Sequence, residues 1–159
     1  VITNINNQEV SSPGELRFRI ATLKVGGKAK LRLVRQGESI TQTMVLEAAP
    51  EVPFRNVTTL KGMQPLSGAT VANMSPALGE ELSLDPMRRG IIVLATESRS
   101  TAQRIGLEPG DWILEINNTK VKLVKDLKRV LEKKRWRSRH QWRITVQRKD
   151  RVFTAVIGE

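Results

Sequence analysis

Apolar and polar residues follow the same order of patterns in two separate stretches of the chain. Residues 1–10 (VITNINNQEV) match residues 112–121 (WILEINNTKV), which indicates an internal repeat. After each match, leucines and isoleucines recur at helical spacing, and apolar residues then alternate with polar ones. The repeated unit is therefore strand, helix, strand, strand, and it covers residues 1–48 and 112–159.

Capping residues define where the first helix begins. Ser12 is the predicted N-cap, Pro13 suits the first helical position, and Glu15 completes a Ser-x-x-Glu capping box. In the second copy the matching helix is predicted over residues 124–134, and its Leu127 aligns with Leu16.

Residues 64–111 have no counterpart in the first copy. Their pattern predicts two strands and two short helices, with Ser75 as the cap of the first helix and Gly106 as the end of the second. Residues 49–63 contain two prolines and little periodicity, so we interpret them as a linker. The four predicted elements are strand 69–73, helix 76–83, strand 90–96 and helix 100–105.

Composition excludes several kinds of chemistry. The 159 residues include no cysteine, which removes disulfides, thiolate catalysis and cysteine metal sites. His140 is the only histidine and no Gly-x-Ser-x-Gly occurs, so we expect neither a Ser-His-Asp site nor a metal site nor a cofactor in this chain. The chain lacks an initiator Met and a signal-peptide pattern, so we interpret Val1 as a cut point in a longer protein.

The stretch STAQRIGLEPGDWILEINNTKV (100–121), with the helix and two strands after it, resembles the PDZ modules of bacterial HtrA/Do-type serine proteases. The resemblance covers residues 64–159 as a complete second PDZ and residues 1–48 as the back half of a first. It predicts an α+β, mainly β fold: a curved sheet capped by two helices, preceded by the partial module. The positions that carry the motif are Ala102, Gly106, Leu107, Gly110, Asp111, Ile113, Asn117 and Val121.

The resemblance implies a groove that binds an extended peptide as an added strand. It assigns the carboxylate-binding loop to Leu66, Ser67, Gly68 and Ala69, where a glycine lets backbone N–H groups face the anion. Gly68 is also explained by a simple turn ahead of a strand, and that alternative stays open here. The other implied residues are the edge strand Thr70, Val71, Ala72 and Asn73 and the helix positions Leu127, Val130 and Leu131.

By resemblance, this chain is a non-catalytic, peptide-binding and regulatory tail of a periplasmic serine endopeptidase that acts in protein quality control. Its implied partners are unfolded or C-terminal peptide segments, its own protease domain and sister subunits of a homo-oligomer, and no nucleic acid is expected. The small residues beside Gly68 favour an alternative, a structural module for oligomer assembly without a peptide ligand.

Two further features have competing interpretations. The net charge is +11, and residues 133–143 combine six basic residues with two tryptophans, so binding to an anionic surface is a third hypothesis. A solvated basic face with Trp142 in the core is the simpler interpretation. Asp111 is interpreted as a turn residue that accepts backbone N–H bonds before a strand, and not as a catalytic group.

Overall fold

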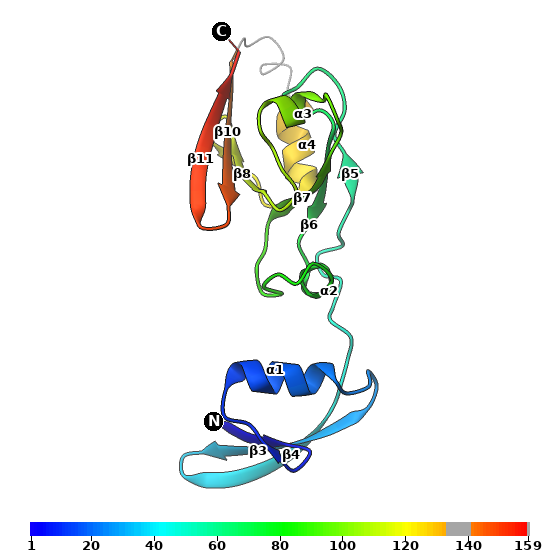
Figure 1. Cartoon of the computed structure of the whole chain (residues 1–159), viewed down its shortest axis with the longest axis vertical. Coiled ribbons are helices and arrows are strands. Elements are labelled where there is room, and N and C mark those ends of the chain that lie inside the picture. Colours follow the sequence, from blue (N-terminus) through cyan, green and yellow to red (C-terminus); the bar gives the residue numbers. More distant parts are fainter. Residues whose placement is uncertain (133–140, 159) are drawn as a thin grey trace. The chain divides into compact units, whose positions relative to one another are not determined.

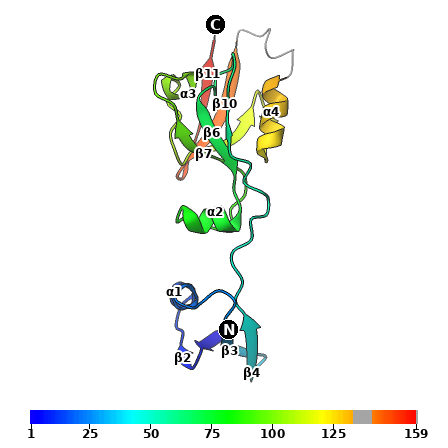
Figure 2. The ribbon, with the colours of Figure 1, turned by 90° about the vertical axis from the view of Figure 1, so that its right-hand side faces the viewer.

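The computed structural model describes residues 1–132 and 141–158. The chain divides into two units, Val1–Ala49 and Pro50–Glu159. Figures 1 and 2 show the helices and strands of both units. Within the described residues, no helix combines the length and the apolar character that crossing a membrane requires.

The first unit is a four-stranded antiparallel sheet with one helix, α1. The strand order is β2-β1-β3-β4, and its small core contains Ile5, Val10, Ala29 and Leu31. The predicted order strand, helix, strand, strand is confirmed, with the two-residue strand β2 in addition. The elements are β1 (Ile2–Ile5), β2 (Gln8–Glu9), α1 (Pro13–Ala21), β3 (Lys28–Arg35) and β4 (Glu38–Val45).

Helix α1 begins as its sequence predicts, with one difference in detail. Ser12 is the N-cap, and its hydroxyl accepts the N–H of Glu15 at 3.1 Å. The Glu15 carboxylate, however, accepts the N–H of Ser11 at 3.0 Å, one residue earlier than a capping box requires. The same carboxylate pairs with Arg19 one turn along the helix at 2.6 Å.

The second unit contains a seven-stranded sheet of order β11-β10-β8-β7-β6-β5, with β9 paired to β8. The predicted strand at 69–73 is found at the same bounds, and Ser75 caps the helix after it. The elements are β5 (Thr58–Thr59), β6 (Ala69–Asn73), α2 (Pro76–Glu81), β7 (Ile91–Thr96), α3 (Thr101–Arg104), β8 (Trp112–Ile116), β9 (Thr119–Lys120), α4 (Val124–Glu132), β10 (Trp142–Arg148) and β11 (Arg151–Ile157).

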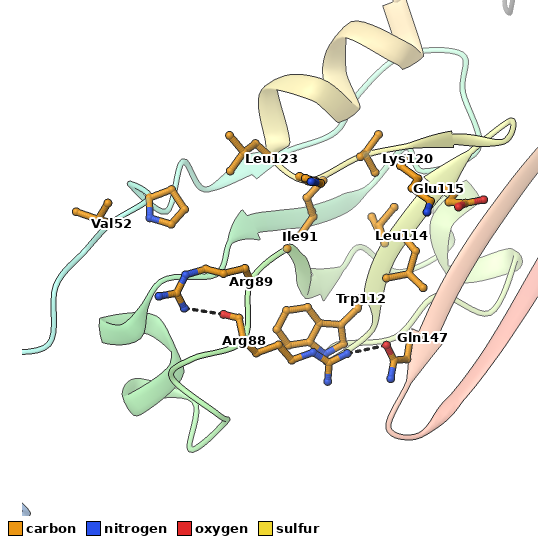
Figure 3. A pocket seen from close by; sticks show the side chains of 15 residues that line it. Val52, Arg88, Arg89, Ile91, Trp112, Leu114, Glu115, Lys120, Leu123 and Gln147 are labelled. Atoms are coloured by element: carbon orange, nitrogen blue, oxygen red, sulfur yellow. Dashed lines mark hydrogen bonds between the residues drawn. The ribbon is translucent and has the colours of Figure 1, made fainter.

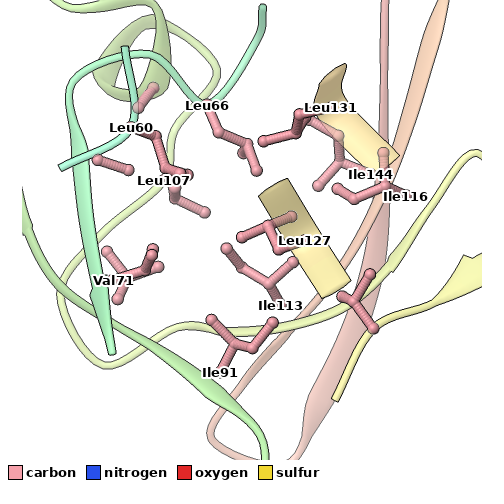
Figure 4. Close-up of a cluster of buried hydrophobic side chains, with 14 of the residues drawn as sticks. Leu60, Leu66, Val71, Ile91, Leu107, Ile113, Ile116, Leu127, Leu131 and Ile144 are labelled. Carbon is pink, nitrogen blue, oxygen red and sulfur yellow. The ribbon is translucent and has the colours of Figure 1, made fainter. Parts of the chain in front are cut away.

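The core of the second unit forms where α4 packs against the sheet (Figure 4). Leu127 and Leu131 of α4 meet Ile113 and Ile116 of β8 and Ile144 of β10 in one buried cluster. Trp142 is 8% exposed and belongs to the same cluster, which confirms its interpretation as a core residue. The predicted mainly β fold is confirmed.

Candidate functional site

The predicted carboxylate loop is a tight turn ahead of β6. Gly68 has φ +87°, in the left-handed region that favours glycine. A Cβ at this position would lie 2.3 Å from Cβ of Ser100, so no other residue fits without a shift of α3. The turn is tied to its surroundings by the Ala102 N–H, which Ser67 O accepts, and by the Glu97 N–H, which Gly68 O accepts.

Backbone N–H groups of this loop all bond within the protein. The N–H of Leu66 donates to Oε1 of Gln64 at 2.7 Å, and those of Ser67 and Ala69 donate to the carbonyls of Gln64 and Leu66. The N–H of Gly68 donates to the carbonyl of Leu60 at 2.8 Å. Three of the four bonds therefore shape the turn itself, and only Gly68 donates outside it.

Strand β6, the predicted peptide-receiving strand, lies between β7 and β5. Thr58 and Thr59 of β5 pair antiparallel with Val71 and Thr70 of β6. Leu60 continues this pairing, because its N–H donates to Ala69 O at 2.8 Å. The edge expected to receive a peptide therefore already carries a short strand of the same chain, a feature that the sequence reasoning missed.

The predicted apolar residues mostly face the core. Leu66, Ala69, Val71 and Ala72 are fully buried, Ser67 and Thr70 are partly exposed, and Leu127 and Val130 of α4 are buried among them. Asn73 is 6% exposed, and its Oδ1 accepts the N–H of Val124 at 2.7 Å, which holds the start of α4 against β6.

A groove of about 620 Å³ runs between β5 and α4. Of the residues predicted to bind peptide, Leu131 lines it, beside Lys128 and Glu132 of the same helix. Its other wall is the chain from Thr58 to Gln64. Strand β5, which pairs with β6, forms the backbone edge of this groove, and no residue of β6 or of the loop 66–69 lines it.

A larger cavity of about 1040 Å³ lies elsewhere in the second unit (Figure 3). Its lining includes Arg88, whose guanidinium stacks 3.8 Å from the ring centre of Trp112 and donates to Gln147. None of the residues predicted to bind peptide lines it. Strand addition needs a backbone edge, and the β5–α4 groove lies beside the strand that pairs with β6 and with the loop before it. This groove is therefore the better candidate site despite its smaller volume.

Asp111 is a structural residue. It is fully buried, and its Oδ2 accepts the N–H of Glu108 at 2.8 Å, which confirms its predicted role in the turn. Arg148 of β10 donates to both carboxylate oxygens, at 2.7 and 2.9 Å, and also pairs with Glu108. The bond to Asp111 raises the pKa of the Arg148 guanidinium.

Other features named from sequence lie partly or wholly outside the described residues. These are His140, the end of the predicted helix at 133–134, and most of the basic stretch 133–143. No cluster of metal-binding side chains occurs among the residues that the structure describes.

The PDZ domain family matches residues 58–157, which include the loop, β6, α4 and all residues that line the β5–α4 groove. The chain belongs to the PDZ domain family. This PDZ module is homologous to DegP/HtrA periplasmic serine proteases. Periplasmic serine endoprotease DegP of Salmonella typhimurium is 30% identical over 134 residues, which are 84% of this chain and 25% of that protein.

A probable DegP-like endoprotease of Chlamydia trachomatis is 33% identical over 132 residues, or 83% of this chain and 25% of the relative. The chain thus spans about a quarter of the length of these relatives. Among solved structures, the HtrA3 PDZ domain bound to a phage-derived ligand has a TM-score of 0.47 and 22% identity, covering 57% of this chain and 81% of that one.

Proposed function

We propose that this PDZ module binds extended peptide segments as an added antiparallel strand, at the edge of β6 that faces α4. The observation that carries the proposal is the position of the Leu60 backbone beside Gly68 and Ala69. Its backbone makes the two bonds that a strand added there would make, to Ala69 and to Gly68. The edge therefore accepts a strand, and its loop offers an N–H to the end of that strand.

Each predicted site residue has a role in this proposal. Leu66, Ser67, Gly68 and Ala69 form the loop, and the Gly68 N–H receives the terminal carboxylate. Thr70, Val71, Ala72 and Asn73 provide the pairing edge. Leu127 and Val130 hold α4 in place from within the core, and Leu131 contacts the ligand from the groove.

Homology to DegP-type proteins supports a wider assignment. We assign the chain to the non-catalytic PDZ region of an HtrA/Do-type serine endopeptidase of the periplasm, with residues 1–48 as the end of a first PDZ, 49–63 as a linker and 64–159 as a second PDZ. In that setting the module captures unfolded or C-terminal segments of substrates and relays their binding to the protease domain and sister subunits.

Titration of the isotope-labelled chain with peptides that end in a free or an amidated carboxyl group tests the peptide-binding role. Hydrogen bonds to a charged group are worth roughly 1.5–3 kcal/mol, so amidation should weaken binding about 10–150-fold. Amide shifts are expected in 66–73 and in the groove-facing part of α4. An intact fold with no shifts there at millimolar peptide would reject the role.

Oligomer assembly without a peptide ligand is the second candidate. Strand β4 of the first unit favours it, because all eight of its residues are exposed, including Ile40 and Met44. An exposed edge strand of this length can pair with another chain. Sedimentation equilibrium distinguishes the two functions, since Thr43→Pro in β4 should dissociate an assembly and leave peptide binding unchanged.

A further inference from the structure

We propose that residues 54–60, here named the resident strand, occupy the peptide-binding edge of the PDZ module and must be displaced before a peptide binds. The proposal rests on the proposed function, because it concerns the regulation of the same site. It assigns a role in the groove to a stretch that the sequence pattern marks as a linker.

The resident strand has the direction of a captured peptide. A peptide whose terminal carboxylate meets the Gly68 N–H must run from the Asn73 end of β6 toward the loop, which is antiparallel to β6. The resident strand runs the same way, with Thr58 opposite Val71 and Thr59 opposite Thr70. The hydroxyls of Thr59 and Thr70 also bond to each other at 2.9 Å.

Leu60 lies where the last residue of such a peptide would lie. Its carbonyl accepts the Gly68 N–H at 2.8 Å, and its side chain is 5% exposed. Figure 4 shows this side chain among those of Leu66 and Leu107 in the buried cluster. A backbone N–H donates one good hydrogen bond, so Leu60 and an incoming carboxylate compete for Gly68.

The other end of the resident strand is held by Asn73 and by an ionic anchor. The N–H and Nδ2 of Asn73 donate to the carbonyls of Arg55 and Phe54 at 2.7 and 2.8 Å. Arg55 bonds Glu51 through two nitrogens, at 2.8 and 2.7 Å, and bonds Glu81 at 2.9 Å. The bond to Arg55 lowers the pKa of Glu51, which favours the charged carboxylate of that residue.

Between its two fixed ends the resident strand is weakly held. Only Thr58 and Thr59 form regular strand, while β6 offers five residues for pairing. Val57 is 53% exposed, and Asn56 adopts φ +46°, which interrupts extended pairing. A peptide without this interruption could stay extended opposite the whole of Ala69–Asn73.

Competition of this kind lowers the apparent affinity for peptides. If the edge is open in about 10% of molecules or fewer, the apparent Kd rises about tenfold or more above its intrinsic value. A change that separates residues 54–59 from β6 would then increase the apparent affinity for peptides. The anchor Glu51–Arg55–Glu81 is the point at which such a change would act.

The test compares four forms of the full chain. The first is wild type, and the second is a release variant that combines Thr58→Pro with Leu60→Ala, since proline cannot continue the pairing and alanine removes the buried side chain. The third is Arg55→Ala, which removes the anchor without touching the groove. Leu84→Ala, at a partly exposed leucine outside the groove, is the matched control.

The probe is a synthetic hexapeptide with the chain's own residues 55–60, RNVTTL, with a free carboxylate or as the amide. The release variant should bind the free acid about tenfold or more tightly than wild type, and Arg55→Ala should fall between them. Leu84→Ala should match wild type. In wild type, saturating peptide should speed hydrogen exchange of the Leu60 N–H while amides of Ala69–Asn73 shift.

The outcomes separate the two proposals. Equal affinity of wild type and the release variant, with shifts in Ala69–Asn73, leaves peptide binding intact and overturns the resident strand as a competitor. No shift in any folded form rejects peptide binding and the competition together. If the release variant does not fold, the wild-type exchange measurement decides, because unchanged protection of Leu60 at saturation also overturns the proposal.

Discussion

The two copies of the repeat share their local structure down to single hydrogen bonds. Asn6 and Asn7 have φ 46° and 65°, and their counterparts Asn117 and Asn118 have φ 49° and 61°. In each copy the first asparagine accepts a backbone N–H from the following long strand, at 2.9 Å for Asn6 and 2.8 Å for Asn117. The repeated sequence thus specifies the same turn twice.

Burial separates the two copies. Helix α4 has four buried residues and α1 has none. Leu127 and Leu131 align with Leu16 and Ile20, but Val130 aligns with Arg19. Leu127 is fully buried, whereas its counterpart Leu16 is partly exposed. Two differences contribute to this. Helix α1 has fewer apolar residues on one face, and residues 64–111, which provide β6, β7 and α3, have no counterpart in Val1–Ala49. Within this chain, the two helices therefore differ in what they contribute to stability.

The largest expected difference is between Leu127→Ala and Leu16→Ala. Loss of a fully buried leucine costs about 2–5 kcal/mol of unfolding free energy, and loss of the partly exposed one about 1 kcal/mol. All tryptophans lie in the second unit, so urea unfolding followed by tryptophan fluorescence reports that unit alone. Resolved NMR peaks of the first unit report the other. Equal losses would show that α1 is as well packed as α4.

Arg148→Met should destabilise only the second unit. It leaves the buried Asp111 carboxylate without its partner, which costs about 2–3 kcal/mol when the partial exposure of Arg148 is taken into account. Arg35 ends the matching strand of the first copy, and Arg35→Met is the control, with an expected change below about 0.5 kcal/mol. The same fluorescence assay measures both, and a small effect of Arg148→Met would mean that Asp111 finds another donor.

Asn117→Ala and Asn6→Ala test whether the shared turn contributes equally to the stability of both copies. Each removes the accepted hydrogen bond and places alanine in the left-handed region, at a combined cost of about 1–2 kcal/mol. Asn→Gly variants at both sites keep the backbone freedom and lose only the bond, so they should be milder. If only Asn117→Ala lowers the unfolding free energy, the contribution of the turn depends on burial in the second unit.

The smallest expected effect concerns pH and the start of α1. Bonds from Ser11 and Arg19 lower the pKa of Glu15 from 4.5 to about 2. Because the folded pKa is depressed, the stabilisation is present above about pH 4.5 and is lost as the pH falls toward 2. NMR titration of the Glu15 side-chain carboxyl measures this directly. A midpoint near 4.5 would mean that the helix start does not hold the carboxylate.

Residue patterns alone predict most of the elements in both units. Strand Ala69–Asn73, the N-caps Ser12 and Ser75 and the turn role of Asp111 follow from spacing and side-chain chemistry, since each depends on neighbours a few residues away. The carboxylate of Glu15 is the exception. The capping-box pattern predicts that it accepts the N–H of the N-cap residue Ser12, but it accepts the N–H of Ser11.

The resident strand could not be predicted in this way. Strand β5 has two residues, which is too short to show a period, and the prolines nearby are typical of a linker. Its pairing joins Leu60 to Gly68 and Ala69 across a turn, and its anchor joins Arg55 to Glu81 across 26 residues. No local signal in 49–63 encodes these partners.

Sequence by itself therefore establishes the repeat, its turns and the loop–strand–helix order that the PDZ family shares, because short-range spacing encodes them. Tertiary structure decides how deeply α4 is buried and what lies on the edge of β6. Burial depends on the surface that distant residues supply, and an unpaired strand edge bonds to whichever segment the fold brings to it. In this chain that segment is its own residues 58–60.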